Sequence, residues 1–374
     1  MERTERKRKT LVISGYYGFG NNGDEAVLHA ILRALRCHGE ENGLDIRPVV
    51  LSINPQATER LHGVRAVHRL KLKDIVRALK ESDGLISGGG SLLQDRTGLR
   101  TIPYYLGIIK LAQWLNKPVY IYSQGLGPIR NTLYFPLIRS VFRRCDYISL
   151  RDEESVRLLR QTGLEDVPVE VASDPVLGLD LAPGAGSADA SREPFIGVAV
   201  RLWHPAKKEL ERIAETLRLL MDELPAARIR FLPFHPPKDE EASRFVMERL
   251  GEAYAGRVSI CPGSDDPSVM FREVASCDLL IGMRLHSLIY AAALRIPMIG
   301  ISYDPKIDHF LRRIDMSAAG SAEEIDPAAV AQAARRLLAE RDAWVREKDP
   351  MITQLQQKSH LPAKHICGQL RNKS

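Results

Sequence analysis

Cysteine pairs, metal-binding motifs and long apolar runs are all missing from this chain of 374 residues, and each absence excludes a class of protein. The five cysteines are odd in number and form no CxxC pair, which argues against a disulfide framework and predicts reduced, mostly buried thiols. No HExxH motif occurs and the ten histidines are scattered, so we expect no metal site.

The chain also lacks the apolar segments that membrane insertion or export requires. No window reaches the roughly 18 apolar residues of a membrane-spanning helix. The basic start MERTERKRKT is followed only by LVISG before a Gly- and Asn-rich stretch, which is too short for the core of a signal peptide. We therefore expect a cytoplasmic protein.

Aromatic residues make up only 6% of the chain, and no basic stripe with interleaved aromatics occurs, so nucleic acid is not expected as a partner. The formal charge is nevertheless +6, and much of the excess lies in RTERKRK and KSHLPAKHICGQLRNKS near the two ends. Two interpretations stay open. The ends are either solvated tails or surfaces that attract an anionic partner, such as the head groups of the inner membrane face.

Short apolar runs alternate with helical periods along most of the chain, which is typical of parallel βαβ units. The runs fall into two sets, at 10–15, 46–52, 84–89, 118–125, 147–150 and 169–174, and at 195–201, 228–234, 257–260, 278–282 and 297–302. This pattern predicts an α/β protein with two Rossmann-like, doubly wound parallel-sheet domains that face a cleft.

A Gly-, Ala-, Ser- and Pro-rich stretch without apolar period separates the two sets and reads as a linker. We therefore predict an acceptor-binding domain at 1–176, a linker at 177–194 and a donor domain at 195–345. A basic C-terminal tail at 346–374 is expected to cross back to the first domain.

Cationic and protonatable residues follow the predicted strands of the second domain. Ligands of open parallel sheets bind beyond the carboxyl ends of the strands, so these residues should converge on one edge. Guanidinium and ammonium groups are suited to anions, and free N–H groups at the start of the helix after Arg284 add to them. The predicted anion-binding residues are Arg201, His235, Arg284, His286 and Lys306.

The first domain presents amides, hydroxyls and carboxylates at the corresponding edge, which suit the hydroxyl groups of a sugar. Arg151 is added as a residue that either reaches the ligand or pairs with the acidic residues beside it. The predicted acceptor-binding residues are Asn21, Asn22, Asp24, Gly89, Gln94, Asp95, Gln124 and Arg151.

Gly18, Gly20 and Gly23 match the spacing of a dinucleotide-binding loop, but the second predicted strand ends without the acidic residue that this motif needs. Asp24 stands where a P-loop would have lysine, so nucleotide binding is not expected there. For Asp24 and Glu25 at the start of a helix, capping and ligand binding both stay open.

Several stretches together resemble the polysaccharide pyruvyl transferase family, in particular the bacterial cell-wall type that attaches pyruvate as a ketal to a lipid-linked disaccharide. They lie between residues 14 and 307 and read GYYGFGNNGDEA, SGGGSLLQD, SQGLGP, RDEES, ASDP and MRLHSLIYAAALRIPMIGISYDPKI.

The resemblance implies a fold like that of two-domain (GT-B) glycosyltransferases, phosphoenolpyruvate as donor and no cofactor. It further implies an undecaprenyl-diphosphate-linked disaccharide as acceptor, ketalised on the 4- and 6-hydroxyls of β-N-acetylmannosamine, as in secondary cell-wall polymers that anchor S-layers. The family's donor-binding turn falls on Arg284, Leu285 and His286, with Arg201 and Lys306 as further donor residues. We expect His286 to act as general acid and base, and Arg284 and Lys306 to stabilise charge.

Two alternatives share much of this pattern. A nucleotide-sugar glycosyltransferase of the same architecture would use the second edge for a diphosphate, with Glu323 or Glu324 as a ribose ligand, unless they cap the last helix. A non-catalytic protein that closes two lobes on an anionic sugar is the other alternative.

Overall fold

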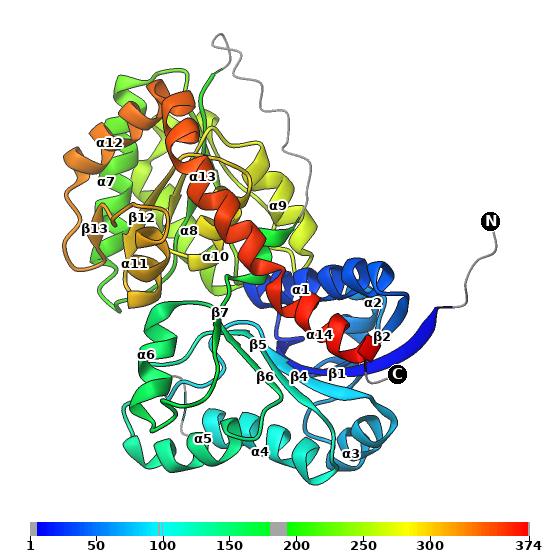
Figure 1. Ribbon diagram of the computed structural model, residues 1–374. Coiled ribbons are helices and arrows are strands. Elements are labelled where there is room, and N and C mark those ends of the chain that lie inside the picture. Colours follow the sequence, from blue (N-terminus) through cyan, green and yellow to red (C-terminus); the bar gives the residue numbers. More distant parts are fainter. Residues whose placement is uncertain (1–5, 96–97, 99, 180–192, 373–374) are drawn as a thin grey trace. The chain divides into compact units, whose positions relative to one another are not determined.

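The computed structural model describes residues 6–95, 98, 100–179 and 193–372, and the chain divides into two compact units. The first unit comprises Met1–Phe19, Asp24–Leu179 and Leu355–Ser374, and the second comprises Gly20–Gly23 and Asp180–Gln354 (Figure 1). Most of the predicted linker, 180–192, lies outside the described residues.

The first unit contains a seven-stranded parallel sheet in the order β3-β2-β1-β4-β5-β6-β7. This order is that of doubly wound dinucleotide-binding folds with one strand added at the edge. The strands are β1 (Lys7–Tyr17), β2 (Leu44–Ser52), β3 (Arg65–His68), β4 (Gly84–Gly88), β5 (Val119–Gln124), β6 (Tyr147–Leu150) and β7 (Glu170–Val171).

Helices cover both faces of this sheet, so β4, β5 and β6 are buried along their whole length. On one face, α3 (Leu72–Glu81), α4 (Thr101–Trp114) and α5 (Phe135–Phe142) share an apolar core with the strands. The other elements of this unit are α1 (Asn22–Glu41), α2 (Pro55–His62), α6 (Glu153–Gln161), α14 (Leu361–Asn372) and two short 3₁₀ helices, η1 (Thr132–Tyr134) and η2 (Pro175–Gly178).

The apolar period of α1 matches its burial. Val27, Ile31, Leu32 and Leu35 are spaced at three to four residues, and all four are buried. Gly89, directly after β4, has a positive φ of 79°, and a Cβ there would lie 2.1 Å from Val27. Glycine is therefore required at this position for α1 to pack against the sheet.

The second unit repeats the doubly wound order in a six-stranded parallel sheet, β10-β9-β8-β11-β12-β13. Its strands are β8 (Phe195–Ala199), β9 (Arg228–Phe231), β10 (Val258–Ile260), β11 (Leu279–Gly282), β12 (Met298–Ser302) and β13 (Gly320–Ser321). Its helices are α7 (Lys208–Glu223), α8 (Lys238–Leu250), η3 (Glu252–Arg257), α9 (Pro267–Ala275), α10 (Leu285–Ala293), α11 (Pro305–Arg312), α12 (Pro327–Ala339) and most of α13 (Arg341–Ser359).

Helices α7, α8 and α12 form one apolar core with this sheet. On the opposite face, small residues in the strands make room for leucines of α10 and α11: a Cβ at Gly300 would lie 2.7 Å from Leu311 and 3.3 Å from Leu288. The strands of this unit also end beside capped helices. Asp266, Asp304 and Asp326 accept backbone N–H bonds at the starts of α9, α11 and α12.

Residues 346–374, which composition alone marked as a basic tail, are helical over nearly their whole length. Ile352, Ile366 and Cys367 in this segment are fully buried. The division into units assigns Leu355–Ser374 to the first unit, where the ring of His360 contacts that of His38 in α1. The segment is therefore part of the packed fold.

All five cysteines are free, and Cys261, Cys277 and Cys367 are buried. Burial raises the pKa of Cys261 to about 11 and that of Cys367 to about 12. Within the described residues, no helix is both long and apolar enough to cross a membrane.

Candidate functional site

The cations predicted from the sequence lie at the carboxyl ends of neighbouring strands in the second unit. Arg201 follows β8 and Arg284 follows β11, and these two strands are adjacent at the point where the strand order reverses. His235 follows β9, and Lys306 lies at the start of α11 after β12. The four residues therefore share one edge of the sheet, where doubly wound folds bind their ligands.

Arg284 is held from behind by a buried carboxylate. Its Nε donates to Oδ2 of Asp239 at 2.9 Å, and its Nη2 donates to Oδ1 of the same residue. The Asp239 side chain is fully buried, and that of Arg284 is only 14% exposed. Burial alone would lower the pKa of Arg284, but Asp239, followed by Tyr303, outweighs burial and raises the pKa above its usual value.

Arg201 is oriented mainly by aromatic rings. Its Nη1 donates to the hydroxyl of Tyr303 at 2.7 Å, and its guanidinium lies 4.4 Å from the centre of the Tyr303 ring and 5.3 Å from that of Trp203. The Nε atom of Arg201 is buried without a hydrogen-bond partner among the described residues. Unlike Arg284, Arg201 has no carboxylate partner in the described part of the chain, so its charge suits an added anion.

His235 stays neutral near physiological pH. Burial, followed by the charge of Arg284, lowers its pKa below the ordinary value, and Asp239 opposes this shift. Its backbone N–H donates to Oδ2 of Asp239 at 2.9 Å, so the same carboxylate supports two of the predicted donor residues.

Leu285 and His286 are the first two residues of α10, and Arg284 precedes this helix in an extended conformation. Both the N–H and the hydroxyl of Ser287 bond back to the carbonyl of Arg284, at 3.0 and 2.6 Å. The turn is thus stabilised by hydrogen bonds among its own residues. The half-buried imidazole of His286 lies in the first turn of the helix. Such a position favours negative charge on a ligand.

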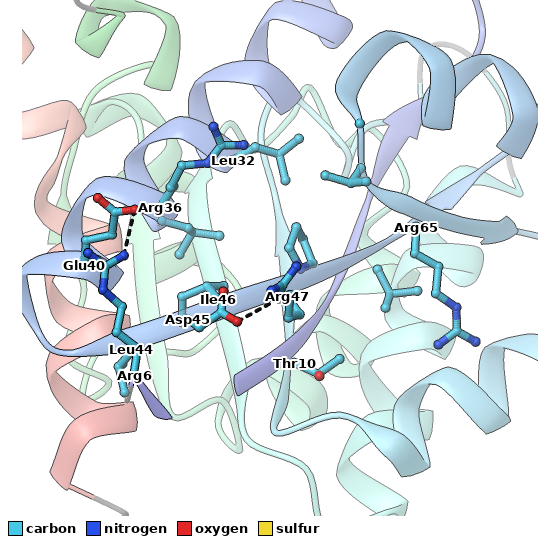
Figure 2. A pocket seen from close by; sticks show the side chains of 15 residues that line it. Arg6, Thr10, Leu32, Arg36, Glu40, Leu44, Asp45, Ile46, Arg47 and Arg65 are labelled. Atoms are coloured by element: carbon cyan, nitrogen blue, oxygen red, sulfur yellow. Dashed lines mark hydrogen bonds and ion pairs between the residues drawn. The ribbon is translucent and has the colours of Figure 1, made fainter. Parts of the chain in front are cut away.

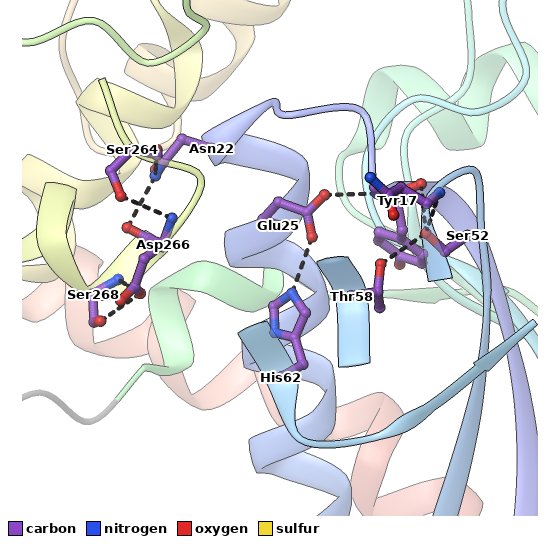
Figure 3. A network of polar contacts seen from close by, with 11 residues as sticks. Tyr17, Asn22, Glu25, Ser52, Thr58, His62, Ser264, Asp266 and Ser268 are labelled. Atoms are coloured by element: carbon purple, nitrogen blue, oxygen red, sulfur yellow. Dashed lines mark hydrogen bonds and ion pairs between the residues drawn. The ribbon is translucent and has the colours of Figure 1, made fainter. Parts of the chain in front are cut away.

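Two of the predicted acceptor residues, Asn21 and Asn22, belong to the second unit by their contacts. Asn22 is fully buried, and its side chain bonds to Ser264 and Asp266 (Figure 3). It also accepts from the hydroxyl of Tyr290. These bonds occupy the side-chain amide of Asn22, so we assign this residue a structural role and do not propose it as a sugar ligand.

In the first unit, Glu25 is a structural carboxylate. It accepts from the backbone N–H of Gly18 at 2.8 Å and pairs with His62 at 3.0 Å (Figure 3). Asp24 lies in the same first turn of α1, and its Oδ1 would be 3.2 Å from a Cβ at Gly90. Asp24 is thus placed beside the glycine loop after β4. Gln94, further along the same loop, is half-buried.

Asp95 holds a loop together. Its Oδ2 accepts from the backbone N–H groups of Arg130 and Asn131 at 2.7 and 2.8 Å. Arg151 is also largely occupied: it bonds to Ser91 at 3.0 Å and lies 3.4 and 3.6 Å from Asp152 and Asp174. Local pairing, one of the two interpretations left open for Arg151, is thus present.

Gln124 differs from these residues. It ends β5, its side chain is fully buried, and neither its Oε1 nor its Nε2 has a hydrogen-bond partner among the described residues. Burying an unsatisfied amide costs free energy, so this group is suited to a polar ligand.

Sequence reasoning missed Arg69, because the four-residue strand β3 before it was not predicted. Arg69 is 7% exposed, donates to the carbonyl of Gly15 at 3.0 Å, and lies 4.3 Å from the centre of the Tyr104 ring. No carboxylate partner of Arg69 occurs in the described ranges. Gly63, which ends α2 in a left-handed conformation, was the available signal that a new strand begins.

Glu323, considered as a ribose ligand, is exposed and pairs with His204 at 3.3 Å. The cap of α12 is Asp326, not Glu323 or Glu324. The described residues contain no cluster of three or more His, Cys, Asp or Glu side chains placed to hold a metal.

A separate pocket of about 550 Å³ lies in the first unit and contains none of the predicted site residues (Figure 2). Four arginines from β2 and the segments around it surround apolar side chains of α1 and β2. Three of them are paired with carboxylates: Arg6 with Glu40, Arg47 with Asp45 and Arg65 with Glu81. The charged residues of this pocket are Arg6, Arg36, Arg47, Arg65, Glu40 and Asp45.

The ion pair between Asp239 and Arg284 leads to a testable prediction about the stability of the protein. Asp239→Ala leaves the buried guanidinium of Arg284 without its counter-charge, so we expect the free energy of unfolding to fall by about 3–5 kcal/mol. Replacing both residues, as Asp239→Leu with Arg284→Met, should cost less than Asp239→Ala alone. Urea unfolding followed by tryptophan fluorescence in a Trp114→Phe background reports on the second unit through Trp203 and Trp344.

Asp222→Ala is the matched control, because this exposed carboxylate only accepts from the hydroxyl of Tyr254. It should change stability by less than about 1 kcal/mol. Equal unfolding midpoints for Asp222→Ala and Asp239→Ala would contradict this account of the ion pair.

Known proteins share this fold at low sequence identity. A UDP-N-acetylglucosamine 2-epimerase from Listeria monocytogenes superposes with a TM-score of 0.66 at 8% identity, covering 98% of this chain and 96% of that one. The ADP-heptose LPS heptosyltransferase II of E. coli gives 0.52 at 16% identity, covering 89% and 99%. The two-domain, GT-B-like fold is therefore confirmed, but identities this low say nothing about activity.

Sequence comparison is more specific. The amylovoran biosynthesis protein AmsJ of Erwinia amylovora is 23% identical over 361 residues, which cover 79% of this chain and 84% of that protein. Residues 21–305 match the polysaccharide pyruvyl transferase family, and this range includes every predicted site residue described above except Lys306. The chain belongs to the polysaccharide pyruvyl transferase family.

Proposed function

We propose that the chain transfers pyruvate from phosphoenolpyruvate, as a ketal, onto a sugar of a lipid-linked saccharide during polysaccharide biosynthesis. The observation that carries the donor assignment is the pair Arg201 and Arg284 on adjacent strand ends, with Lys306 at the start of the helix after the next strand. Phosphoenolpyruvate carries a phosphate and a carboxylate on one small skeleton, and two guanidinium groups with an ammonium match both anions.

Within this proposal, Arg284 presents one edge of its guanidinium to the donor. Asp239 accepts from Nε and Nη2, and Tyr303 also interacts with this guanidinium. Arginine has five N–H groups, so N–H groups that these two residues do not occupy are available to the substrate. Arg201 binds the second anionic group, Lys306 adds positive charge, and Leu285 and the neutral His235 border the same site. Because the residues behind Arg284 are already ordered, little reorganisation is needed when charge builds up on the leaving phosphate.

His286 is the proposed general acid and base. The methylene carbon of phosphoenolpyruvate must gain a proton to become a methyl group, and C2 must form bonds to two sugar oxygens while its bond to the phosphate oxygen breaks. Two hydroxyl protons are lost: one balances the new methyl group and the other leaves on phosphate. An imidazole can both donate and accept protons, so His286 can mediate these transfers in sequence.

For the acceptor we propose β-N-acetylmannosamine in an undecaprenyl-diphosphate-linked disaccharide, modified on its 4- and 6-hydroxyls. The unsatisfied amide of Gln124 and the buried cation of Arg69 support a polar, anionic acceptor in the first unit. Asp24, Gln94 and Arg151 stay in the proposed acceptor set, as does Asn21 of the second unit. Gly89 and Asp95 are assigned to packing and loop structure.

The reaction predicts phosphate release that depends on both substrates. With a synthetic β-N-acetylmannosaminyl-N-acetylglucosamine diphosphate lipid, His286→Ala should lower kcat by about 10²-fold or more, because proton transfer is lost. Arg284→Ala should lower kcat/KM for phosphoenolpyruvate by a similar factor. Exposed His365→Ala and Arg272→Ala serve as controls and should stay near wild type. Phosphate release that needs no acceptor, or that survives both site substitutions, would contradict the proposal.

A second prediction concerns Gln124. Gln124→Ala removes the buried amide and should raise KM for the acceptor by about tenfold while KM for phosphoenolpyruvate stays unchanged, since each buried hydrogen bond is worth about 1 kcal/mol or more. Steady-state kinetics with either substrate varied makes the measurement. Gln113→Ala is the control, because its amide donates to the carbonyl of Val141 and to the sulfur of Cys145, outside both sheet edges. An equal rise in both KM values would point to a general structural role instead.

We also propose that the pocket around Arg36, Arg47 and Arg65 contacts anionic phospholipid head groups at the inner membrane face, where a lipid-linked acceptor would lie. Four arginines gather here, and Arg36, an exposed one, has no carboxylate partner among the described residues, which supports this contact. Replacing Arg36, Arg47 and Arg65 by glutamine should weaken sedimentation with phosphatidylglycerol vesicles by about tenfold or more at low salt.

The matched control replaces Lys208, Arg212 and Arg218, three exposed cations of α7, by glutamine. This variant has the same net charge as the pocket variant. If the two variants sediment alike, a specific contact at the pocket is ruled out, and wild-type protein that stays in the supernatant would rule out membrane attachment altogether.

A further inference from the structure

The Gly20–Gly23 segment follows β1 in the chain but makes its contacts in the second unit. The backbone N–H of Asn22 donates to the carbonyl of Phe234 at 3.0 Å. Its side-chain Nδ2 donates to the carbonyls of Ser264 and Asp266 at 3.0 and 3.3 Å (Figure 3). Asn22 is thereby bonded to the loops before both α8 and α9.

The remaining polar atom of Asn22 reaches helix α10. Its Oδ1 accepts from the hydroxyl of Tyr290 at 2.8 Å, and both residues are fully buried. The Tyr290 ring packs between Phe234 and Phe271, with ring centres 5.3 and 4.6 Å away. Tyr290 is therefore a fixed point on α10, and Asn22 is bonded directly to it.

Gly23 contacts the same helix one turn earlier. A Cβ at Gly23 would lie 2.2 Å from Nδ1 of His286, 2.6 Å from Cγ and 2.9 Å from Cε1. Real Cβ atoms do not approach ring atoms so closely, so only glycine allows the backbone to lie against this edge of the imidazole. The N–H of Gly23 is in turn bonded to Oδ1 of Asn21 at 3.2 Å.

His286 and Tyr290 are four residues apart on α10 and thus lie on the same helix face. One short segment contacts both: Asn22 bonds to Tyr290, and Gly23 packs on His286. The hydrogen bonds of Asn22 set the position of the segment, and Gly23 limits the orientations that the imidazole can take.

We infer that Asn22 and Gly23 are positioning residues for His286, and that these two residues serve proton transfer by holding the imidazole rather than by binding a sugar. The inference rests on the proposed function for its catalytic meaning, but the hold on the imidazole can be measured without any turnover.

The test uses Gly23→Ala in the full-length chain. The added methyl must displace the imidazole, so the ¹³Cε1–¹H resonance of His286, assigned with His286→Gln, should shift. In kinetics, kcat should fall by about 10²-fold while KM for phosphoenolpyruvate stays within about twofold, because the arginines that bind the donor are untouched. Gly256→Ala is the matched control, since a Cβ there meets open space in the same unit.

Tyr290→Phe is the milder variant, in case Gly23→Ala disturbs folding. It removes one hydroxyl from the bond to Asn22, and kcat should fall several-fold with the same resonance displaced. Tyr254→Phe, which loses an exposed hydroxyl bond to Asp222, is its control.

The outcomes are distinct. A His286 resonance that stays in place in both Gly23→Ala and Tyr290→Phe overturns the inference. A resonance that moves in both, in a protein whose wild type releases no phosphate from phosphoenolpyruvate with any acceptor, supports the hold on His286 while the proposed function fails. Loss of kcat together with a large rise in KM for phosphoenolpyruvate would also overturn the positioning role, because it would indicate damage to the whole site.

Discussion

The buried ion pair between Arg284 and Asp239 is the interaction on which the cationic edge of the second unit depends. A guanidinium with so little exposure is stable only beside a counter-charge, and Asp239 provides it while also accepting the backbone N–H of His235. Two strand ends are thus tied to one carboxylate on α8. This pair fixes the orientation of Arg284 in the proposed donor site, because the side chain cannot rotate away from the edge without breaking its hydrogen bonds to Asp239.

The same strand order, repeated in both units, produces two edges of different chemistry. In the second unit the residues after the central strands are arginines, supported by Asp239, Tyr303 and Trp203. In the first unit, most charged groups after the strands are neutralised by neighbours, as Arg151 is by Asp152 and Asp174. Two buried residues of the first unit differ from these: Arg69 has no carboxylate partner among the described residues, and the uncharged amide of Gln124 has no hydrogen-bond partner among them. This contrast underlies the assignment of the donor to one edge and the acceptor to the other.

Much of the fold followed from the sequence, since buried parallel strands leave strong apolar runs. The run at 147–150 coincides with β6, and the other predicted runs overlap their strands to within a few residues. The strands β3 and β13 were missed because they contain almost no apolar run: β3 reads RAVH and β13 reads GS. The loss of β3 also concealed Arg69, which only the end of that strand identifies as a site candidate.

The cations at the second edge could be predicted from the sequence because each lies within a few residues of the end of a strand. The residues that hold this edge in place could not be predicted, since Asp239 is 45 residues from Arg284 in the chain and Asn22 is 268 residues from Tyr290. Asn22 looked like a sugar ligand because its position after β1 is where ligands bind in such folds. Its burial and its bonds across the chain are tertiary facts, which no local pattern encodes.

The most direct test of the central claim, that the second unit's cationic edge binds phosphoenolpyruvate, is calorimetric titration of the protein with phosphoenolpyruvate and, separately, with UDP-N-acetylglucosamine. The account predicts saturable binding of phosphoenolpyruvate that Arg201→Ala and Arg284→Ala each weaken strongly, and no binding of the nucleotide sugar at these arginines. Tight binding of the nucleotide sugar that the same substitutions abolish, with no heat from phosphoenolpyruvate, would contradict it and assign the edge to a glycosyltransferase donor.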